Sequence, residues 1–368
     1  MKISIIGTGY VGLVAAACSA DKGFEVITSS HDEDKVKTIN KGRAPFYEKG
    51  LDEIVERAVK KGTLRAVIGR EEAILNSDIS FIAVGTPSLP DGSADLTFIK
   101  RTALEIGKAL KKRGDYHLVV ARSTVVPGTT RTVIKPLVEK ESGKKAGLDF
   151  GLCMSPEFLR QGNAVYDTLR PDRLVVGEFD TRSGDMLYDF YEQFYGKDSF
   201  PILRMNMESA EMVKYASNAF LATKISFINE IASICETVAG VDVYEVAKGV
   251  GLDSRISPKF LRAGSGFGGS CFPKDVKALI AFAKERDYEP NLLEEVLNKN
   301  IRQAMHVVEL AESGLGTLQN KTIAILGLSF KTLTPHHLGN MFNPNLSSRS
   351  ITFFGTSVIM PCPPTSKW

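Results

Sequence analysis

The chain has 368 residues, of which 43% are hydrophobic and 24% are charged, a composition typical of a soluble globular protein with two or three domains. The net charge of +3 is small and cationic residues alternate with acidic ones, which argues against nucleic-acid binding. No uncharged apolar run of 18 residues and no signal-peptide cleavage pattern occur, so we expect no membrane span and no secretion signal.

Cysteine usage indicates a reducing compartment. The five cysteines are widely spaced and include no Cys-x-x-Cys pair: Cys18, Cys153, Cys235, Cys271 and Cys362. That spacing argues against a zinc site and against a disulfide framework. We therefore expect a cytoplasmic protein that holds no metal.

The first thirty residues predict a βαβ unit. Residues 2–6 form a short apolar strand, residues 11–22 an alanine-rich helix and residues 24–29 a second strand. The glycines of the first turn, Gly7, Gly9 and Gly12, have the Gly-x-Gly-x-x-Gly spacing that lets a pyrophosphate sit on a helix N-terminus. The sequence thus predicts a doubly wound α/β sheet that binds a dinucleotide.

The end of the second strand leaves the choice of dinucleotide open. An Asp or Glu usually stands there and accepts hydrogen bonds from the ribose hydroxyls, but this chain has Ser30, with His31 and Lys35 nearby. A small hydroxyl beside these groups tolerates a 2′-phosphate, whereas a serine that binds the ribose unaided leaves the cofactor as NAD. NAD is the main expectation, and NADP is the alternative.

Three further strands end in polar turns. The turns contain Thr86, Ser123 with Thr124, and Glu157, and each follows an apolar run. Ligands bind at the carboxyl edge of a parallel sheet, so these residues are candidates for the site. Cys153 lies within the third run and is expected in the core.

A helix is predicted over residues 209–240, which contain no proline and no interior glycine. Lys214 and Asn218 are four residues apart and share one face. Alanine, methionine and phenylalanine recur at helical spacing and indicate a core or a subunit interface, with Cys235 near that stripe.

The stretch "GSGFGGSCFPKD", residues 264–275, places Cys271 after a run of glycines and before a helix whose first turn contains Pro273. The positive end of a helix lowers a thiol pKa, and Lys274 adds a cation. Asp275 is positioned to orient a water molecule. The alternative is a buried structural thiol, but a loop this rich in glycine disfavours burial.

Nine motifs in order resemble the UDP-glucose/GDP-mannose dehydrogenase family over residues 1 to about 331. They are "GTGYVG", "YEKGLDE", "FIAVGTP", "RSTVVPGTT", "SPEFLRQG", "PDRLVVG", "VKYASNAFLATKISFINE", "GFGGSCFPKD" and "GLSFK". The resemblance implies oxidation of a sugar C6 alcohol to a carboxylate through two hydride transfers to NAD, with a cysteine thiohemiacetal and thioester as intermediates. The form "FGGSCFPKD" favours UDP-glucose as substrate.

The resemblance also implies residue roles. The implied nucleophile is Cys271, and the implied oxyanion-stabilising residues are Lys214 and Asn218. The residues implied to hold or activate water are Thr124, Glu157 and Asp275. Which one takes the alcohol proton stays open. Cofactor contacts fall on Gly7, Gly9, Tyr10, Val11, Gly12, Ser30, Lys35, Thr86, Thr124, Glu157 and Lys274.

The sugar-nucleotide site is implied to comprise Glu157, Phe158, Leu159, Arg160, Gln161, Lys214, Asn218, Arg255, Phe260, Leu261, Arg262, Ala263, Gly264, Gly268 and Lys331. Arg255 is expected to reach it from a second subunit, since the long helix implies a homodimer. Two positions depart from the family pattern: Ser30 replaces an Asp, and Gln161 replaces a Glu and so lacks its charge.

The expected architecture has three parts: an NAD-binding Rossmann-like domain over residues 1–200, a helical dimerisation and catalytic domain over 201–300, and an incomplete second Rossmann-like domain over 301–368. After Lys331 the sequence loses the family pattern, with Leu338 at an arginine position. We expect a truncated or frameshifted end, weak UDP-glucose binding and low turnover. The alternatives are a dehydrogenase of another nucleotide sugar, such as GDP-mannose, and an inactive dinucleotide-binding remnant.

Overall fold

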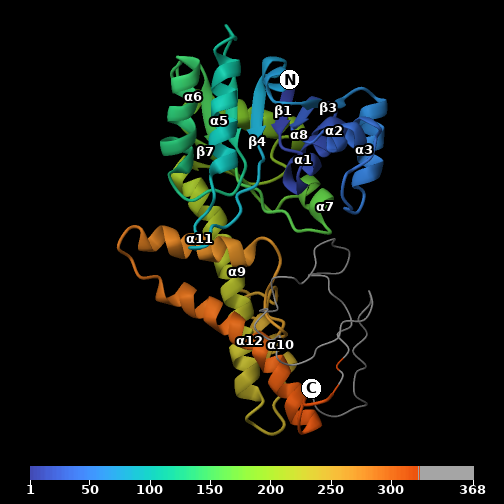
Figure 1. The fold of residues 1–368 in the computed structure, drawn as a ribbon, viewed down its shortest axis with the longest axis vertical. Coiled ribbons are helices and arrows are strands. Elements are labelled where there is room, and N and C mark those ends of the chain that lie inside the picture. The colour runs from blue at the N-terminus through green and yellow to red at the C-terminus, as the bar shows by residue number, and fades with distance from the viewer. Residues whose placement is uncertain (322, 324–368) are drawn as a thin grey trace. The chain divides into compact units, whose positions relative to one another are not determined.

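The computed structural model describes residues 1–321 and residue 323, and the chain divides into two units. The first contains residues 1–90 and 94–215, and the second contains residues 91–93 and the described residues from 216 onward. The predicted third-domain strand with Lys331, and the tail with Leu338 and Cys362, lie outside the described residues. Figure 1 shows the elements of both units.

The first unit is built on one eight-stranded sheet with the order β3-β2-β1-β4-β5-β6-β7-β8. Its strands are β1 (Lys2–Ile6), β2 (Glu25–Ser30), β3 (Leu64–Ile68), β4 (Ile79–Ile82), β5 (Leu118–Ala121), β6 (Gly151–Met154), β7 (Leu174–Glu178) and β8 (Ile202–Asn206). The first six run parallel, which confirms the doubly wound α/β prediction. The β1–β2 register places Ile6 opposite Ser29, so both strands end together at the carboxyl edge.

The last two strands differ from an all-parallel sheet. β7 pairs antiparallel with β6, with Met154 opposite Gly177, and β8 then runs parallel to β7. An antiparallel neighbour needs no crossover helix on the face of the sheet. The segment between β6 and β7 accordingly carries only the short helix α7 (Ala164–Leu169).

Helices cover both faces of this sheet (Figure 1). The remaining helices of the first unit are α1 (Tyr10–Asp21), α2 (Glu33–Asn40), α3 (Leu51–Lys60), α4 (Glu71–Leu75), α5 (Thr97–Leu110), α6 (Lys135–Ser142), which follows a π-helical turn over Thr130–Ile134, and α8 (Thr181–Tyr195). Successive strand residues point to opposite faces, so Leu118 and Val120 pack with α1 and α8 while Val119 and Ala121 pack with α5 and α6. Cys153 is buried in the first of these cores, as predicted.

The second unit is helical. It consists of the later part of α9 (Met207–Cys235) together with α10 (Val243–Gly251), α11 (Phe272–Lys284) and α12 (Asn291–Leu315). A small apolar cluster of Ile228, Ala247 and Leu261 packs α9 against α10 and the loop after it. The predicted long helix is confirmed, although it ends at Cys235 and not near residue 240. Cys235 is buried, as expected for a packing residue.

One glycine tests how tightly α9 packs on the sheet. A methyl group at Gly177 would lie 2.5 Å from Ala210 Cβ and 3.0 Å from Met207 Cα, so we expect Gly177→Ala to destabilise the protein by about 1–3 kcal/mol. The control is Gly114→Ala, where the added methyl meets nothing within 4 Å. Thermal unfolding should show a lower midpoint only for Gly177→Ala, and equal midpoints would contradict this packing.

Candidate active site

The glycine turn after β1 has the geometry of a pyrophosphate cradle. Gly7 has a φ of +119°, and a Cβ on Gly12 would lie 2.0 Å from the Gly7 carbonyl oxygen, so both positions exclude side chains. Gly9 is the N-cap of α1, makes no side-chain cap and leaves open space around its Cβ position. These residues fit a dinucleotide, whose phosphates would be held by the first amides of α1, at Tyr10 and Val11. When bound, the dinucleotide supplies a hydride acceptor.

Ser30 ends β2, as predicted, and its hydroxyl accepts a hydrogen bond from the Asp32 amide at 3.1 Å. Asp32 then caps α2 by accepting the Lys35 amide at 3.1 Å, and its carboxylate lies 3.6 Å from the Lys35 ammonium. The amide of Lys35 holds the pKa of Asp32 below its usual value. A carboxylate therefore does stand close to the strand end, two residues later than the usual acidic position.

The turns after β4 and β5 are tied together. The Thr86 hydroxyl donates to the Thr124 carbonyl oxygen at 2.8 Å, and the Ser123 hydroxyl donates to the Val84 carbonyl oxygen at 2.6 Å. Thr86 and Ser123 are both buried. The structure thus brings Thr86 and Thr124, two predicted cofactor residues, into direct contact.

Glu157 and Lys214 form a buried ion pair, with 3.1 Å between carboxylate and ammonium. Both side chains are less than 10% exposed. Glu157 also accepts the Leu159 amide at 2.6 Å, and the Lys214 ammonium lies 5.5 Å from the centre of the Phe158 ring. Burial by itself would raise the pKa of Glu157, but the Lys214 charge and the Leu159 amide outweigh it and hold the pKa below its usual value. Two predicted catalytic residues therefore meet as charged groups.

The predicted site did not include Glu211, which lies one turn before Lys214 in α9. Its buried carboxylate accepts hydrogen bonds from the Gly128 amide at 2.5 Å, the Thr130 amide at 2.8 Å and the Thr130 hydroxyl at 2.6 Å. Burial raises its pKa to about 7. Glu211 thereby attaches α9 to the loop that follows β5, and no local signal in the sequence marks this contact.

The predicted site also did not include Glu48, although this residue lies in the "YEKGLDE" motif. Its buried carboxylate accepts the amides of Gly162 and Ala164 at 2.8 Å each, in the loop predicted to contact the sugar nucleotide. In that loop Arg160 pairs with Asp167 at 2.6 Å. The predicted residues Phe158, Leu159 and Gln161 lie in the same segment.

In the second unit, Cys271 is the N-cap of α11 and its side chain is exposed, as predicted. One turn later, Asp275 is buried and accepts hydrogen bonds from Asn218 Nδ2 at 2.6 Å and from the Lys274 ammonium at 2.5 Å. The structure therefore brings together the predicted residues Asn218, Lys274 and Asp275. Asn218 follows Lys214 by four residues in α9.

The glycine-rich loop before Cys271 is held by two asparagines. The Gly264 amide donates to Asn229 Oδ1 at 2.8 Å, and the Phe267 amide donates to Asn300 Oδ1 at 2.6 Å. Gly266 has a φ of +98°, and a Cβ there would lie 2.5 Å from Asn300 Oδ1. Gly266 is thus required by packing within the protein, a role that the glycine run in the sequence did not indicate.

Other predicted sugar-nucleotide residues lie in this loop or in the segment before it. Arg255 is 87% exposed and pairs with Asp253 at 2.6 Å, while Arg262 is exposed and Leu261 is buried. The Phe260 ring lies 6.1 Å from the Phe272 ring. Ala263 is partly buried and Gly268 is buried, and Lys331 lies outside the described residues.

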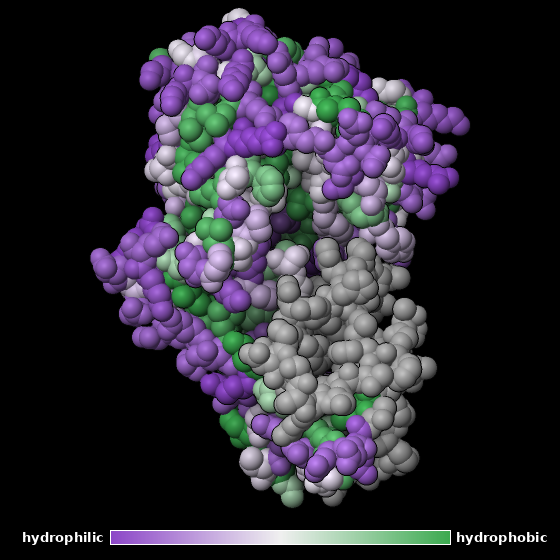
Figure 2. Space-filling model, in the orientation of Figure 1, coloured by the Kyte–Doolittle hydropathy of each residue, from purple (hydrophilic) through white to green (hydrophobic). Residues whose placement is uncertain are grey.

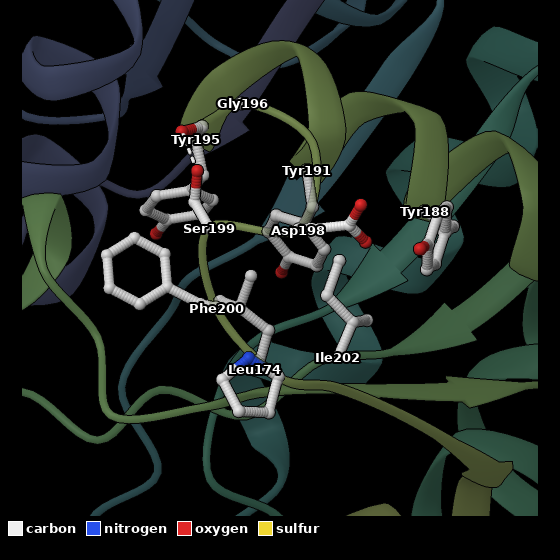
Figure 3. A pocket seen from close by; sticks show the side chains of 10 residues that line it. Leu174, Tyr188, Tyr191, Tyr195, Gly196, Asp198, Ser199, Phe200 and Ile202 are labelled. Carbon is white, nitrogen blue, oxygen red and sulfur yellow. Dashed lines mark hydrogen bonds between the residues drawn. The ribbon is translucent and has the colours of Figure 1, made fainter.

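A cavity of about 370 Å³ lies elsewhere in the first unit (Figure 3). It is lined by aromatic side chains at the end of α8 and by the segment leading into β8, including Tyr188, Tyr191, Tyr195, Asp198 and Phe200. None of the predicted site residues lines it. Cavity size alone therefore does not locate the predicted chemistry.

Across residues 1–321 and 323, we find no cluster of three or more His, Cys, Asp or Glu side chains arranged to bind a metal ion. Within the same part of the chain, no helix has the length and apolar character needed to cross a membrane. His336 and His337, the adjacent pair in the tail, lie outside the described residues.

Comparison with known proteins gives two family matches. Residues 1–195 match the NAD binding domain of the UDP-glucose/GDP-mannose dehydrogenase family, and residues 208–302 match the central domain of that family. The dinucleotide of the first unit is therefore NAD. That NADP is also tolerated stays a prediction, which rests on Ser30.

Individual relatives match most of the chain. UDP-glucose 6-dehydrogenase TuaD of Bacillus subtilis (strain 168) is 45% identical over 90% of this chain and 70% of its own length. UDP-glucose 6-dehydrogenase AglM of Haloferax volcanii is 46% identical over 90% of this chain and 76% of its own length. A GDP-mannose 6-dehydrogenase of Pseudomonas savastanoi pv. phaseolicola is 41% identical over 91% of this chain and 75% of its own length.

Among solved structures, a UDP-glucose dehydrogenase from the hyperthermophilic archaeon Pyrobaculum islandicum matches with a TM-score of 0.89 and 40% identity. The match covers 96% of this chain and 80% of that one. The similarity of fold thus extends over both units and is accompanied by substantial sequence identity.

The pyrophosphate cradle can be tested with two glycine variants. We expect Gly9→Ala to fold normally, because its methyl meets no protein atom, but to weaken NAD binding by about tenfold or more, or ~1.4 kcal/mol. Gly12→Ala should instead disrupt the unit itself. Calorimetry with NAD and circular dichroism distinguish the two effects, and undiminished NAD affinity in Gly9→Ala would disprove the assigned approach of the phosphates.

Proposed function

Because the chain belongs to the UDP-glucose/GDP-mannose dehydrogenase family, we propose that it oxidises the C6 alcohol of UDP-glucose to a carboxylate, with NAD as hydride acceptor. The observation that carries the proposal is the exposed Cys271 thiol at the N-terminus of α11, one turn before the buried Asp275. A thiol in that position is available to attack an aldehyde, and the helix terminus stabilises its thiolate form.

The reaction divides into two oxidations and a hydrolysis. Loss of a hydride and a proton converts the alcohol to an aldehyde, and NAD supplies the hydride acceptor in both oxidations. The Cys271 thiolate then adds to the aldehyde carbon, and the resulting thiohemiacetal is oxidised to a thioester. Water cleaves the thioester, which releases the carboxylate and regenerates the thiol.

Polar side chains are assigned to the charges that these reaction steps create. We assign oxyanion stabilisation to the Lys214 ammonium and the Asn218 amide. The carboxylates of Glu157 and Asp275 and the hydroxyl of Thr124 are assigned to hold water and to accept protons. The lowered pKa of Glu157 beside Lys214 supports an ionised carboxylate at neutral pH, which can orient a water molecule.

The choice of sugar nucleotide rests on the relatives. UDP-glucose 6-dehydrogenases at 45–46% identity favour UDP-glucose, whereas GDP-mannose 6-dehydrogenases at 41–42% identity keep GDP-mannose as the second candidate. Formation of NADH with each nucleotide sugar separates the two candidates. No NADH with any of them would leave a protein that binds dinucleotide without turnover.

Replacement of the proposed nucleophile tests the mechanism. Cys271→Ser should abolish uronate formation, because a serine hydroxyl is a far weaker nucleophile, while NAD binding persists. The matched control is Cys235→Ala, which removes a buried thiol of α9 and should preserve activity. Mass spectrometry of the product gives the measurement, and full uronate yield from Cys271→Ser would overturn the covalent route.

We also propose that the chain forms a homodimer through α9 and acts in the cytoplasm, where a reactive thiol stays reduced. Phe220, Phe227 and Ile234 recur every seven residues on α9 and are 65%, 51% and 54% exposed. Hydrophobic residues also reach the surface of the second unit in Figure 2. A repeated apolar stripe on a long helix supports pairing with a second copy.

A charge placed in this stripe should prevent dimer formation. Phe227→Glu puts a carboxylate where an apolar contact is proposed, so sedimentation velocity should show a monomer. Phe98→Glu is the matched control, because Phe98 is 48% exposed on α5 of the first unit and should leave the dimer intact. A dimeric Phe227→Glu protein would contradict the proposed interface.

A further inference from the structure

Tyr10 takes part in two features of the first unit at once. Tyr10 is the first residue of α1 and directly follows Gly9 of the predicted pyrophosphate cradle. Its ring centre lies 5.6 Å from that of Phe46. The hydroxyl donates a short hydrogen bond to the buried Glu48 carboxylate and accepts one from the Gly162 amide at 2.9 Å.

Glu48 attaches the loop at residues 160–164 to the rest of the unit. One carboxylate oxygen accepts the Gly162 amide and the other accepts the Ala164 amide, each at 2.8 Å. Glu48 is only 4% exposed, so these donors replace water around a buried charge. One carboxylate oxygen thus depends on the Ala164 amide, whereas the other is shared by the Gly162 amide and the Tyr10 hydroxyl.

The loop has an internal structure of its own. Arg160 pairs with Asp167 at 2.6 Å, the Asn163 amide donates to the Arg160 carbonyl oxygen at 2.9 Å, and Gly162 has a φ of +83°. Residues 160–167 therefore form a compact turn. The hydrogen bonds of Glu48 and Tyr10 attach this turn to the start of α1.

The Tyr10 hydroxyl keeps its proton. Burial raises the pKa of Tyr10 well above its usual value, and the neighbouring Glu48 carboxylate raises it further. The hydroxyl therefore remains protonated, and able to donate to Glu48, at neutral pH.

We propose that Tyr10 and Glu48 are positioning residues that couple NAD binding to the order of residues 160–164, and through this loop to binding of the nucleotide sugar. Phosphates on the α1 amides fix the backbone of Tyr10, and its side chain passes that constraint to Glu48 and the loop. Each ligand then meets a site that the other has already ordered, so each binds more tightly when the other is present. The second half of this inference rests on the proposed function, and the first half does not.

Hydrogen exchange tests the coupling between NAD and the loop without any substrate. In the wild-type chain, NAD should slow amide exchange in peptides covering residues 160–164. In Tyr10→Phe, which keeps the ring beside Phe46 and removes only the hydroxyl, this protection should be largely lost. The matched control is Tyr195→Phe, which removes a hydroxyl bonded to the Thr168 carbonyl oxygen at 2.8 Å and should keep it. Equal protection in Tyr10→Phe and wild type would overturn the proposal.

Calorimetry tests the coupling between the two ligands. UDP-glucose should increase the affinity of the wild-type chain for NAD by about fivefold or more, the lower end of common coupling factors. In Tyr10→Phe and Glu48→Gln the factor should fall towards one, and an unchanged factor would refute the coupling. If the wild-type chain forms no NADH with any nucleotide sugar, the proposed function fails, yet the exchange experiment still decides the link between NAD and the loop.

Discussion

An ionised carboxylate can be buried in a protein only where donors replace the water it loses, and this constraint organises the first unit. Glu48, Glu157 and Glu211 are all buried, and each accepts at least one backbone amide of a loop. These amides belong to the segments that follow β5 and β6, near the carboxyl edge of the sheet. Three acids thus hold in place the loops that contain Thr124 and the predicted contacts at residues 157–161.

These acids also link the loops to helices. Glu211 extends from α9 to the loop after β5, and Lys214, one turn further along α9, pairs with Glu157 after β6. A displacement of the first two turns of α9 would therefore disturb both loops together. The position of Lys214 depends on a contact one turn away as well as on its own ion pair.

Features that depend on local chemistry could be predicted from the sequence. The glycines at residues 7, 9 and 12 identify a strand–turn–helix, and Pro273 after Cys271 identifies a helix start, because each has a conformational requirement of its own. The role of Glu48 could not be predicted, since its partner Gly162 is 114 residues away. The contact of Gly266 with Asn300, and the reversal of β7, likewise depend on long-range packing that no local periodicity records.

The reversal of β7 also determines which way the chain travels afterwards. Because β7 and β8 run opposite to the other strands, α9 leaves β8 close to Gly177 and heads towards the edge at which β1 to β6 end. Successive turns of α9 meet Gly177, then Thr130, then Glu157. Had β7 continued in the common direction, the same helix would have carried Lys214 away from Glu157. The polarity of the last two strands thus decides which end of the sheet receives the lysine.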